Sequence, residues 1–193
     1  MKLNASYWDD RYISGTIPWD IGYASPAIKL YFEKVSRDAK ILIPGAGKAH
    51  EAAWLMKQGF EQVYVCDWAE HALEYFLEMV PDFPRDQLII GDFFKIEDTF
   101  DYIIEQTFFC ALDPALRKNY TLKMKDLLRP GGRLVGLLFA SVFDRPGPPF
   151  GGTKAEYLAL FSPHFDIIQM EITDLSIPPR MGNELFFEMK RGD

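Results

Sequence analysis

The sequence has only two cysteines, Cys66 and Cys110, among 193 residues. Both stand in apolar surroundings, and two thiols offer too little material for a disulfide framework or a thiolate zinc site. The three histidines, His50, His71 and His164, fall in separate segments without the tight helical spacing of a metal site. We therefore predict packed thiols and no bound metal.

The chain also lacks long apolar runs and an excess of basic residues. No run approaches the ~20 apolar residues that span a bilayer, and the first residues lack the apolar core of a signal peptide. Lys and Arg number 21 against 28 Asp and Glu, which gives a net charge of -7 and disfavours binding to a nucleic-acid backbone. We expect a cytoplasmic protein that binds neither membranes nor nucleic acids.

What the sequence does contain is an alternation of short apolar runs with longer segments of helical period, which is typical of βαβ units. The predicted strands are 40–43, 62–66, 87–90, 101–104, 133–138, 165–172 and 184–190. The last two flank a Pro-rich loop too short for a crossover helix, so they are predicted to be antiparallel. The predicted fold is α/β: one domain with a seven-stranded, mostly parallel sheet, an antiparallel strand near one edge, and helices on both faces.

Two helix starts are marked by capping signals. Ser25-Pro26 offers an N-cap with Pro at the first helical position, and apolar residues follow it at helical spacing. The segment 153–156, Thr-Lys-Ala-Glu, has the pattern of a capping box. We therefore predict one helix before the first strand and a short helix before the last two strands.

The loop after the first strand is a candidate binding site, because ligands of open parallel sheets collect at the carboxyl ends of the strands. It contains Gly45 and Gly47, which allow backbone to approach a ligand closely. A plain tight turn between strand and helix is the alternative, since glycine is also the default turn residue. A dinucleotide loop would place a third small residue in step, whereas Glu51 here adds negative charge near the phosphates. The loop thus favours a nucleoside without phosphates.

Carboxylates follow the next two strands. Asp67 lies about 20 residues beyond the glycines, where an acid accepts hydrogen bonds from ribose hydroxyls; the alternative is an N-cap for a helix over 69–80. Asp92 ends the third strand and can accept the exocyclic amine of an adenine, with Phe93 lining the ring face. Three adjacent strand ends converge on one nucleoside.

This arrangement resembles that of Rossmann-like, class I S-adenosylmethionine-dependent methyltransferases over residues 40–138. A finer resemblance, over nearly the whole chain, is to the thiopurine methyltransferase superfamily and within it to the plant-type halide/thiol methyltransferases. It rests on the segments Tyr-Trp-Asp-Asp-Arg-Tyr at 7–12, Ile-Pro-Trp-Asp at 17–20, Pro-Gly-Ala-Gly at 44–47, Thr-Phe-Phe-Cys-Ala-Leu at 107–112 and Gly-Pro-Pro-Phe at 147–150.

The resemblance implies S-adenosylmethionine as cofactor and S-adenosylhomocysteine as product. The cofactor-binding residues that it implies are Trp8, Tyr12, Trp19, Gly45, Gly47, Asp67, Trp68, Asp92, Phe93 and Gln106. Three residues differ from those usual in the family. This chain has Tyr12 where the family usually has Trp, and Gln106 and Phe150 where the family usually has Tyr.

The N-terminal aromatic residues would enclose the cofactor. A sulfonium beside a Trp face gains up to ~2 kcal/mol where water is excluded. Trp8, Tyr12 and Trp19 would then belong to a helical lid of residues 1–37 over a core of residues 38–193. The alternative is an aromatic staple that packs an added helix onto the core.

The sequence shows no Ser-His-Asp or paired-carboxylate arrangement, and we assign no catalytic acid or base. Methyl transfer from a sulfonium to an anion needs positioning and desolvation more than a base. We therefore expect a small-molecule acceptor that is a soft nucleophile: a thiol, bisulfide, halide or thiocyanate. Phe108, Phe139 and Phe150 would form its apolar wall. Arg180 would hold an anionic acceptor, or else be a surface arginine.

Other functions stay open at this point. These are an aromatic-thiol or metalloid methyltransferase, a non-catalytic S-adenosylmethionine-binding module and, disfavoured by the glycine spacing, an NAD-dependent oxidoreductase. The oligomeric state is also open, and the sequence is compatible with a monomer.

Overall fold

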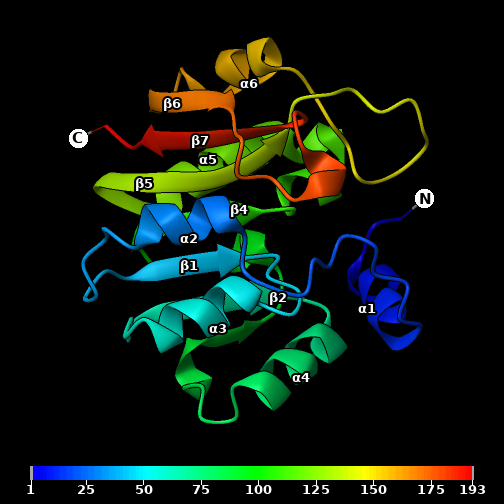
Figure 1. The fold of residues 1–193 in the computed structure, drawn as a ribbon, viewed down its shortest axis with the longest axis vertical. Coiled ribbons are helices and arrows are strands. Elements are labelled where there is room, and N and C mark those ends of the chain that lie inside the picture. The colour runs from blue at the N-terminus through cyan, green and yellow to red at the C-terminus, as the bar shows by residue number, and fades with distance from the viewer. Residues whose placement is uncertain (1, 193) are drawn as a thin grey trace.

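Seven strands form one sheet in the order β3-β2-β1-β4-β5-β7-β6 within residues 2–192, the part of the chain that the computed structural model describes (Figure 1). The strands are β1 Ile41–Pro44, β2 Val63–Asp67, β3 Leu88–Ile90, β4 Phe100–Gln106, β5 Leu128–Phe139, β6 Asp166–Ile172 and β7 Glu184–Lys190. The first five pair in parallel, and β7 runs antiparallel to both of its neighbours, β5 and β6. The predicted sheet is therefore confirmed, including its antiparallel strand near one edge.

The largest boundary difference is at β5, which begins at Leu128 and not at Arg133. Phe100 of β4 pairs with Leu128, and the register then shifts before Tyr102 pairs with Arg133. This early part of β5 depends on its partner strand and not on its own apolar pattern.

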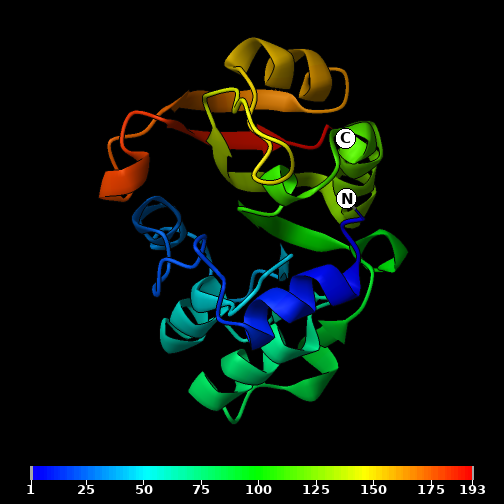
Figure 2. The same ribbon diagram turned by 90° about the vertical axis from the view of Figure 1, so that its right-hand side faces the viewer.

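Helices cover both faces of the sheet, as predicted (Figures 1 and 2). They are α1 Ala5–Ile13, α2 Pro26–Phe32, α3 His50–Lys57, α4 Glu70–Met79, α5 Arg117–Leu127 and α6 Lys154–Phe161, with 3-10 turns η1 Arg85–Gln87, η2 Phe93–Lys95, η3 Phe109–Ala111, η4 Pro114–Leu116 and η5 Pro178–Arg180. Helices α2, α3 and α4 pack on one face around Ile41 and Val65. Helices α5 and α6 pack on the other face around Ile103 and Leu134. No helix within residues 2–192 is long and apolar enough to cross a bilayer.

The two predicted helix starts are present. Thr153 begins α6 with a capping box in which its hydroxyl accepts from the Glu156 amide and Glu156 accepts from the Thr153 amide. Ser25 is the N-cap residue of α2, but its side chain makes no capping bond. Instead the backbone N–H of Ser25 donates to Glu51 Oε1 at 2.9 Å. A buried carboxylate of α3 therefore holds the start of α2.

The two N-terminal helices occupy different places. In α2, Ile28 and Phe32 are fully buried against the sheet, so this helix is part of the core layer. In contrast, α1 packs on α4 and lies toward the edge to which β1 points (Figure 1). Figure 2 shows this edge, with α1 on one side and the loop between β5 and α6 on the other. Of the predicted lid, only α1 and the residues up to Tyr23 line the cavity described next.

Candidate active site

A cavity of about 530 Å³ opens at the carboxyl ends of β1, β2 and β4. This volume is in the range of small-molecule sites. All ten predicted cofactor-binding residues line it: Trp8, Tyr12, Trp19, Gly45, Gly47, Asp67, Trp68, Asp92, Phe93 and Gln106. The fold thus brings the glycine loop, both carboxylates and the N-terminal aromatic residues to one place.

Three of the four predicted acceptor-binding residues also line this cavity: Phe108, Phe139 and Arg180. Phe150 is not among the lining residues, although Pro148 and Pro149 are. The Phe150 amide donates to the carbonyl oxygen of Cys110 at 2.6 Å, and its own carbonyl accepts from Arg117. These backbone bonds hold the end of the Gly-Pro-Pro-Phe segment beside α5.

The glycine loop has a left-handed backbone at both predicted glycines. Gly45 has φ +57° and Gly47 has φ +55°, where L side chains are strained. A Cβ on Gly45 would overlap the ring of Phe108, and one on Gly47 would meet the Tyr12 hydroxyl. The loop therefore needs glycine both for its backbone and for the rings packed on it.

Asp67 joins the glycine loop to the start of α4. Its Oδ2 accepts the N–H of Gly47 at 2.8 Å, and its Oδ1 accepts the N–H of Ala69 at 2.9 Å. Burial raises the pKa of this carboxyl, while the hydrogen bonds from the two backbone N–H groups oppose the shift. The N-cap of α4 is Ala69 and not Asp67. Each carboxylate oxygen keeps a further lone pair that ribose hydroxyls can use.

Asp92 lies at the next strand end. Its Oδ1 accepts the Phe94 amide at 2.9 Å, and its Oδ2 has no hydrogen-bond partner among residues 2–192. The adjacent Phe93 is 5% exposed and packs edge-on against Phe108, with ring centroids 5.2 Å apart. An acceptor oxygen and a ring thus stand side by side where an adenine was expected.

The N-terminal aromatic residues form one edge-to-face stack. The Trp8 and Trp19 centroids are 5.4 Å apart, and those of Tyr12 and Trp19 are 6.0 Å apart. Trp19 Nε1 donates to the Tyr12 hydroxyl at 3.3 Å. We name residues 5–23, which carry these rings, the cap.

Two polar pairs that sequence reasoning missed attach the cap to the core. In the cap, Asp9 accepts the backbone N–H of His71 at 3.0 Å and lies 2.8 Å from its Nδ1. Asp20 lies 2.8 Å from His50 Nε2 and 3.0 Å from Lys48 Nζ. Because His50 begins α3 and His71 is in the first turn of α4, both attachments reach the helices that follow the glycine loop and Asp67. Nothing in the sequence spacing marks these pairs.

Arg180 connects the cap to the opposite wall. Its Nη2 donates to the carbonyl oxygen of Trp19 at 2.9 Å, and its Nη1 lies 3.3 Å from the buried Glu184. The guanidinium also lies 5.7 Å from the centre of the Phe139 ring. The side chain is 11% exposed, so Arg180 is not a surface arginine.

The thiols and the other candidate ligands give no sign of metal or nucleophilic chemistry. Burial raises the pKa of both Cys66 and Cys110 to about 12, so each is a neutral thiol near pH 7. Within residues 2–192, no group of three or more His, Cys, Asp or Glu side chains is arranged to hold a metal ion.

Comparison with known proteins identifies the family. The model of the family described as thiopurine S-methyltransferase matches residues 3–190. This chain belongs to the thiopurine S-methyltransferase family. A family relative from Arabidopsis thaliana, named probable thiol methyltransferase 2, is 30% identical over 95% of this chain and 84% of its own length. The thiopurine S-methyltransferase of Pseudomonas fluorescens is 28% identical over 90% of this chain and 88% of its own length.

Solved structures show the same fold. The 1,6-didemethyltoxoflavin-N1-methyltransferase of Burkholderia thailandensis, solved with bound S-adenosylhomocysteine, aligns over 99% of this chain and 88% of its own, with a TM-score of 0.79 at 20% identity. The fold of this thiopurine S-methyltransferase family member is therefore the class I methyltransferase fold. The protein is an S-adenosylmethionine-dependent methyltransferase.

The cavity fits this cofactor in its chemistry. Asp67 and Asp92 offer free acceptor capacity for the hydroxyls and amine of a nucleoside. The indoles of Trp8 and Trp19 line the cavity, and an indole face attracts a positive sulfur. S-adenosylmethionine supplies an activated methyl group when bound, and Asp67, Asp92 and the Trp residues of the cap would hold it in this cavity.

Proposed function

We propose that this methyltransferase transfers the methyl group to a small soft nucleophile, such as a thiol, bisulfide, halide or thiocyanate, by in-line displacement. The observation that carries the proposal is that Arg180 lies against Phe139 in the same cavity as the residues predicted to bind the cofactor. The guanidinium attracts an anion, and the apolar wall beside it excludes water from that anion. An already ionised nucleophile needs both effects. The names of two plant relatives, a probable thiol methyltransferase and a thiocyanate methyltransferase of Brassica oleracea, support this acceptor class.

Further charges around the cavity support an anionic acceptor. Arg11 and Arg145 also line the cavity, and neither has a carboxylate partner among residues 2–192. Pro146, Pro148 and Pro149 lie on the same loop as Arg145 and add apolar surface. On this proposal the protein moves no proton in the transfer step, because the acceptor arrives ionised and the cofactor leaves as a neutral thioether.

A second candidate acceptor is an aromatic thiol. The aromatic lining by Phe93, Phe108 and Phe139 favours it, because flat rings pack well on such walls. The name of the relative from Pseudomonas fluorescens supports this alternative.

A turnover screen tests the proposal. The protein is incubated with S-adenosylmethionine and, separately, iodide, bisulfide, thiocyanate or thiophenol, and S-adenosylhomocysteine and the methylated product are quantified. Product from a small anion supports the proposal, and product from thiophenol alone supports the second candidate. Binding of S-adenosylmethionine without S-adenosylhomocysteine from any acceptor would show a binding module and overturn both.

A further inference from the structure

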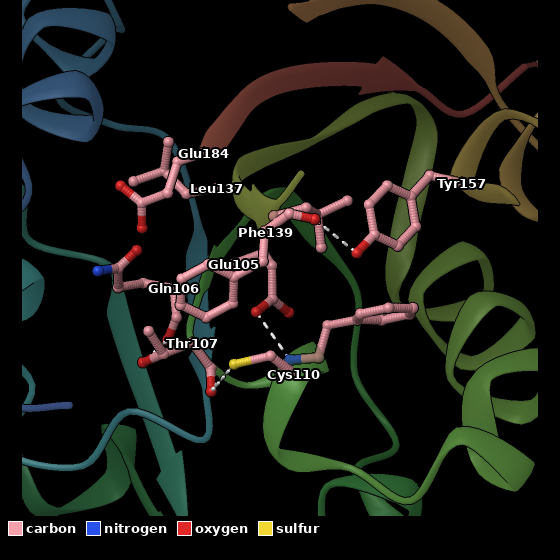
Figure 3. A pocket seen from close by; sticks show the side chains of 10 residues that line it. Glu105, Gln106, Thr107, Cys110, Leu137, Phe139, Tyr157 and Glu184 are labelled. Carbon is pink, nitrogen blue, oxygen red and sulfur yellow. Dashed lines mark hydrogen bonds between the residues drawn. The ribbon is translucent and has the colours of Figure 1, made fainter. Parts of the chain in front are cut away.

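A buried carboxylate lies behind the cavity, where β4 ends. Glu105 is fully buried, and its Oε1 accepts the backbone N–H of Phe108 at 2.8 Å and that of Phe109 at 2.9 Å. Figure 3 shows its side chain among the residues that line a small cavity. The Tyr120 hydroxyl of α5 donates to its Oε2. No Lys, Arg or His pairs with Glu105 within residues 2–192. Three hydrogen-bond donors, and no cation, therefore hold this carboxylate.

The turn that Glu105 binds has a strained backbone. Thr107 has φ +59°, which is unfavourable for a β-branched residue because its side chain crowds the backbone in the left-handed region. Glu105 precedes Thr107, and the two backbone N–H groups that donate to it, those of Phe108 and Phe109, follow Thr107. These two hydrogen bonds therefore span the strained residue. Cys110 Sγ also donates to the Thr107 carbonyl at 3.3 Å (Figure 3). The turn keeps its shape because these neighbours hold it.

Three residues of the same turn line the cofactor cavity. They are Gln106, Thr107 and Phe108, whereas Glu105 lines only a small internal cavity beside it. The Phe108 ring occupies the space above Gly45. A change at Glu105 therefore reaches the cavity through the turn.

We propose that Glu105 is a positioning residue for methyl transfer, whose carboxylate holds the turn 106–109 so that Phe108 and Gln106 stay against cofactor and acceptor. This inference rests on the proposed function, because it concerns the same cavity. A misplacement of about 1 Å at a reacting centre lowers a rate by about a hundredfold. The hydrogen bonds that fix the turn 106–109 therefore affect the rate of methyl transfer.

The ionisation of Glu105 gives the proposal a measurable signature. Burial raises the pKa of Glu105 to about 7, while the bonds from Tyr120 and the two amides oppose the shift. Protonation of Glu105 weakens the hydrogen bonds from the two backbone N–H groups, because hydrogen bonds to a charged acceptor are stronger than those to a neutral one. The turn is then held less firmly below about pH 7 than above it.

Other titratable groups surround Glu105. The surrounding titratable side chains are Tyr120 of α5, Cys110 of η3, Tyr157 of α6 and Glu184 of β7. Burial raises the pKa of both tyrosines and of the thiol, so these stay neutral near pH 7. Glu184 is paired with Arg180. Comparison with a Glu105 variant therefore decides whether a transition near pH 7 comes from Glu105.

The central variant is Glu105→Gln, whose side-chain carbonyl still accepts both amides while its charge and its titration are removed. Thiocyanate is the acceptor, because it is an anion over the whole pH range and does not itself titrate. We expect the wild-type kcat to rise about tenfold through pH 7, and we expect the profile of Glu105→Gln to lack this step. An unchanged step in Glu105→Gln would overturn the proposal.

Two further variants separate positioning from a general effect on the fold. Tyr120→Phe removes the donor to Oε2 with little loss of volume, and we expect the midpoint of the step to move to higher pH. Glu188→Gln is the matched control, because Glu188 is a buried carboxylate of β7 that pairs with Arg133 and does not line the cavity. It should keep the wild-type profile. A midpoint that stays in place in Tyr120→Phe, or a step lost in Glu188→Gln, would contradict the role of Glu105.

A double-mutant cycle tests whether Glu105 acts through the turn. If it does, Glu105→Gln lowers kcat less in a Phe108→Leu background than in the wild type, because the two residues share one effect. Fully additive losses would mean that Glu105 does not act through Phe108.

Binding of S-adenosylhomocysteine, measured by calorimetry over the same pH range, keeps this inference separate from the proposed function. If the wild type turns over no acceptor, the proposed function fails. The ratio of the dissociation constants of Glu105→Gln and wild type should still change about threefold or more across pH 7. A constant ratio would overturn the inference alone.

Discussion

The Asp67 carboxylate accepts the backbone N–H of Gly47 at 2.8 Å, so the residue that ends β2 holds the loop that follows β1. The other oxygen of Asp67 holds the start of α4 through the Ala69 amide. One carboxylate therefore fixes two neighbouring parts of the cofactor cavity while it also lines that cavity. We therefore expect Asp67 to affect cofactor binding both directly and through the loop.

Replacing Asp67 by Asn should weaken S-adenosylhomocysteine binding by about tenfold to a hundredfold. The new amide group faces a backbone N–H, so one buried donor is left unpaired at a cost of about 1–3 kcal/mol. Calorimetry measures the dissociation constant. Asp98→Asn is the control, because Asp98 pairs with Lys40 outside the cavity and its loss should leave the affinity unchanged. Equal affinities of Asp67→Asn and the wild type would refute the ribose assignment.

Gly45→Ala should strongly impair cofactor binding. An alanine at φ +57° costs about 1–2 kcal/mol, and its Cβ would also overlap Phe108. Gly59→Ala is the matched control, since Gly59 has φ +87° but no atom within 4 Å of an added Cβ. It should lower the melting temperature and keep S-adenosylhomocysteine binding. Adding Phe108→Ala to Gly45→Ala should restore part of the binding, and no recovery would argue against the steric explanation.

Asp9→Asn should loosen the cap in a pH-dependent way. The hydrogen bond that the His71 ring donates to Asp9 raises the pKa of His71 above its ordinary value of 6.5. The charged pair therefore stabilises the docked cap fully below pH 6.5, and this contribution is lost as the pH rises through the raised pKa. Hydrogen exchange of the α1 amides, corrected for the intrinsic rate, should differ most between variant and wild type at low pH. A difference that does not depend on pH would contradict the ion pair.

Arg180→Ala should lower both stability and acceptor binding, and a second substitution separates the two effects. Removing the guanidinium leaves the buried Glu184 without its ionic partner, which costs about 3 kcal/mol or more for a buried pair. The double variant Arg180→Gln with Glu184→Gln should regain the melting temperature but keep a raised KM for thiocyanate. A wild-type KM in that double variant would mean that Arg180 has a structural role only.

Much of the fold was predictable because central parallel strands such as β1 and β2 are buried on both faces and have continuous apolar runs in the sequence. The carboxyl ends of such strands meet at one edge, so Gly45, Asp67 and Asp92 were correctly predicted to lie together. The start of β5 was missed because it depends on pairing with Phe100.

The polar pairs that hold the site were not predictable for a related reason. Asp9 and His71 are 62 residues apart, and Arg180 and Trp19 are 161 apart. Glu105 is apparent as a site residue only once α5 brings Tyr120 to it. Such pairs depend on how helices and loops pack, and no local period in the sequence carries that information.

The most direct test of the account is a crystal structure of the protein grown with S-adenosylhomocysteine. The account predicts the ribose hydroxyls against Asp67, the adenine beside Asp92 and Phe93, and the sulfur under the rings of Trp8 and Trp19. A ligand bound outside this cavity, or bound in it with its sulfur turned away from the cap, would contradict the account.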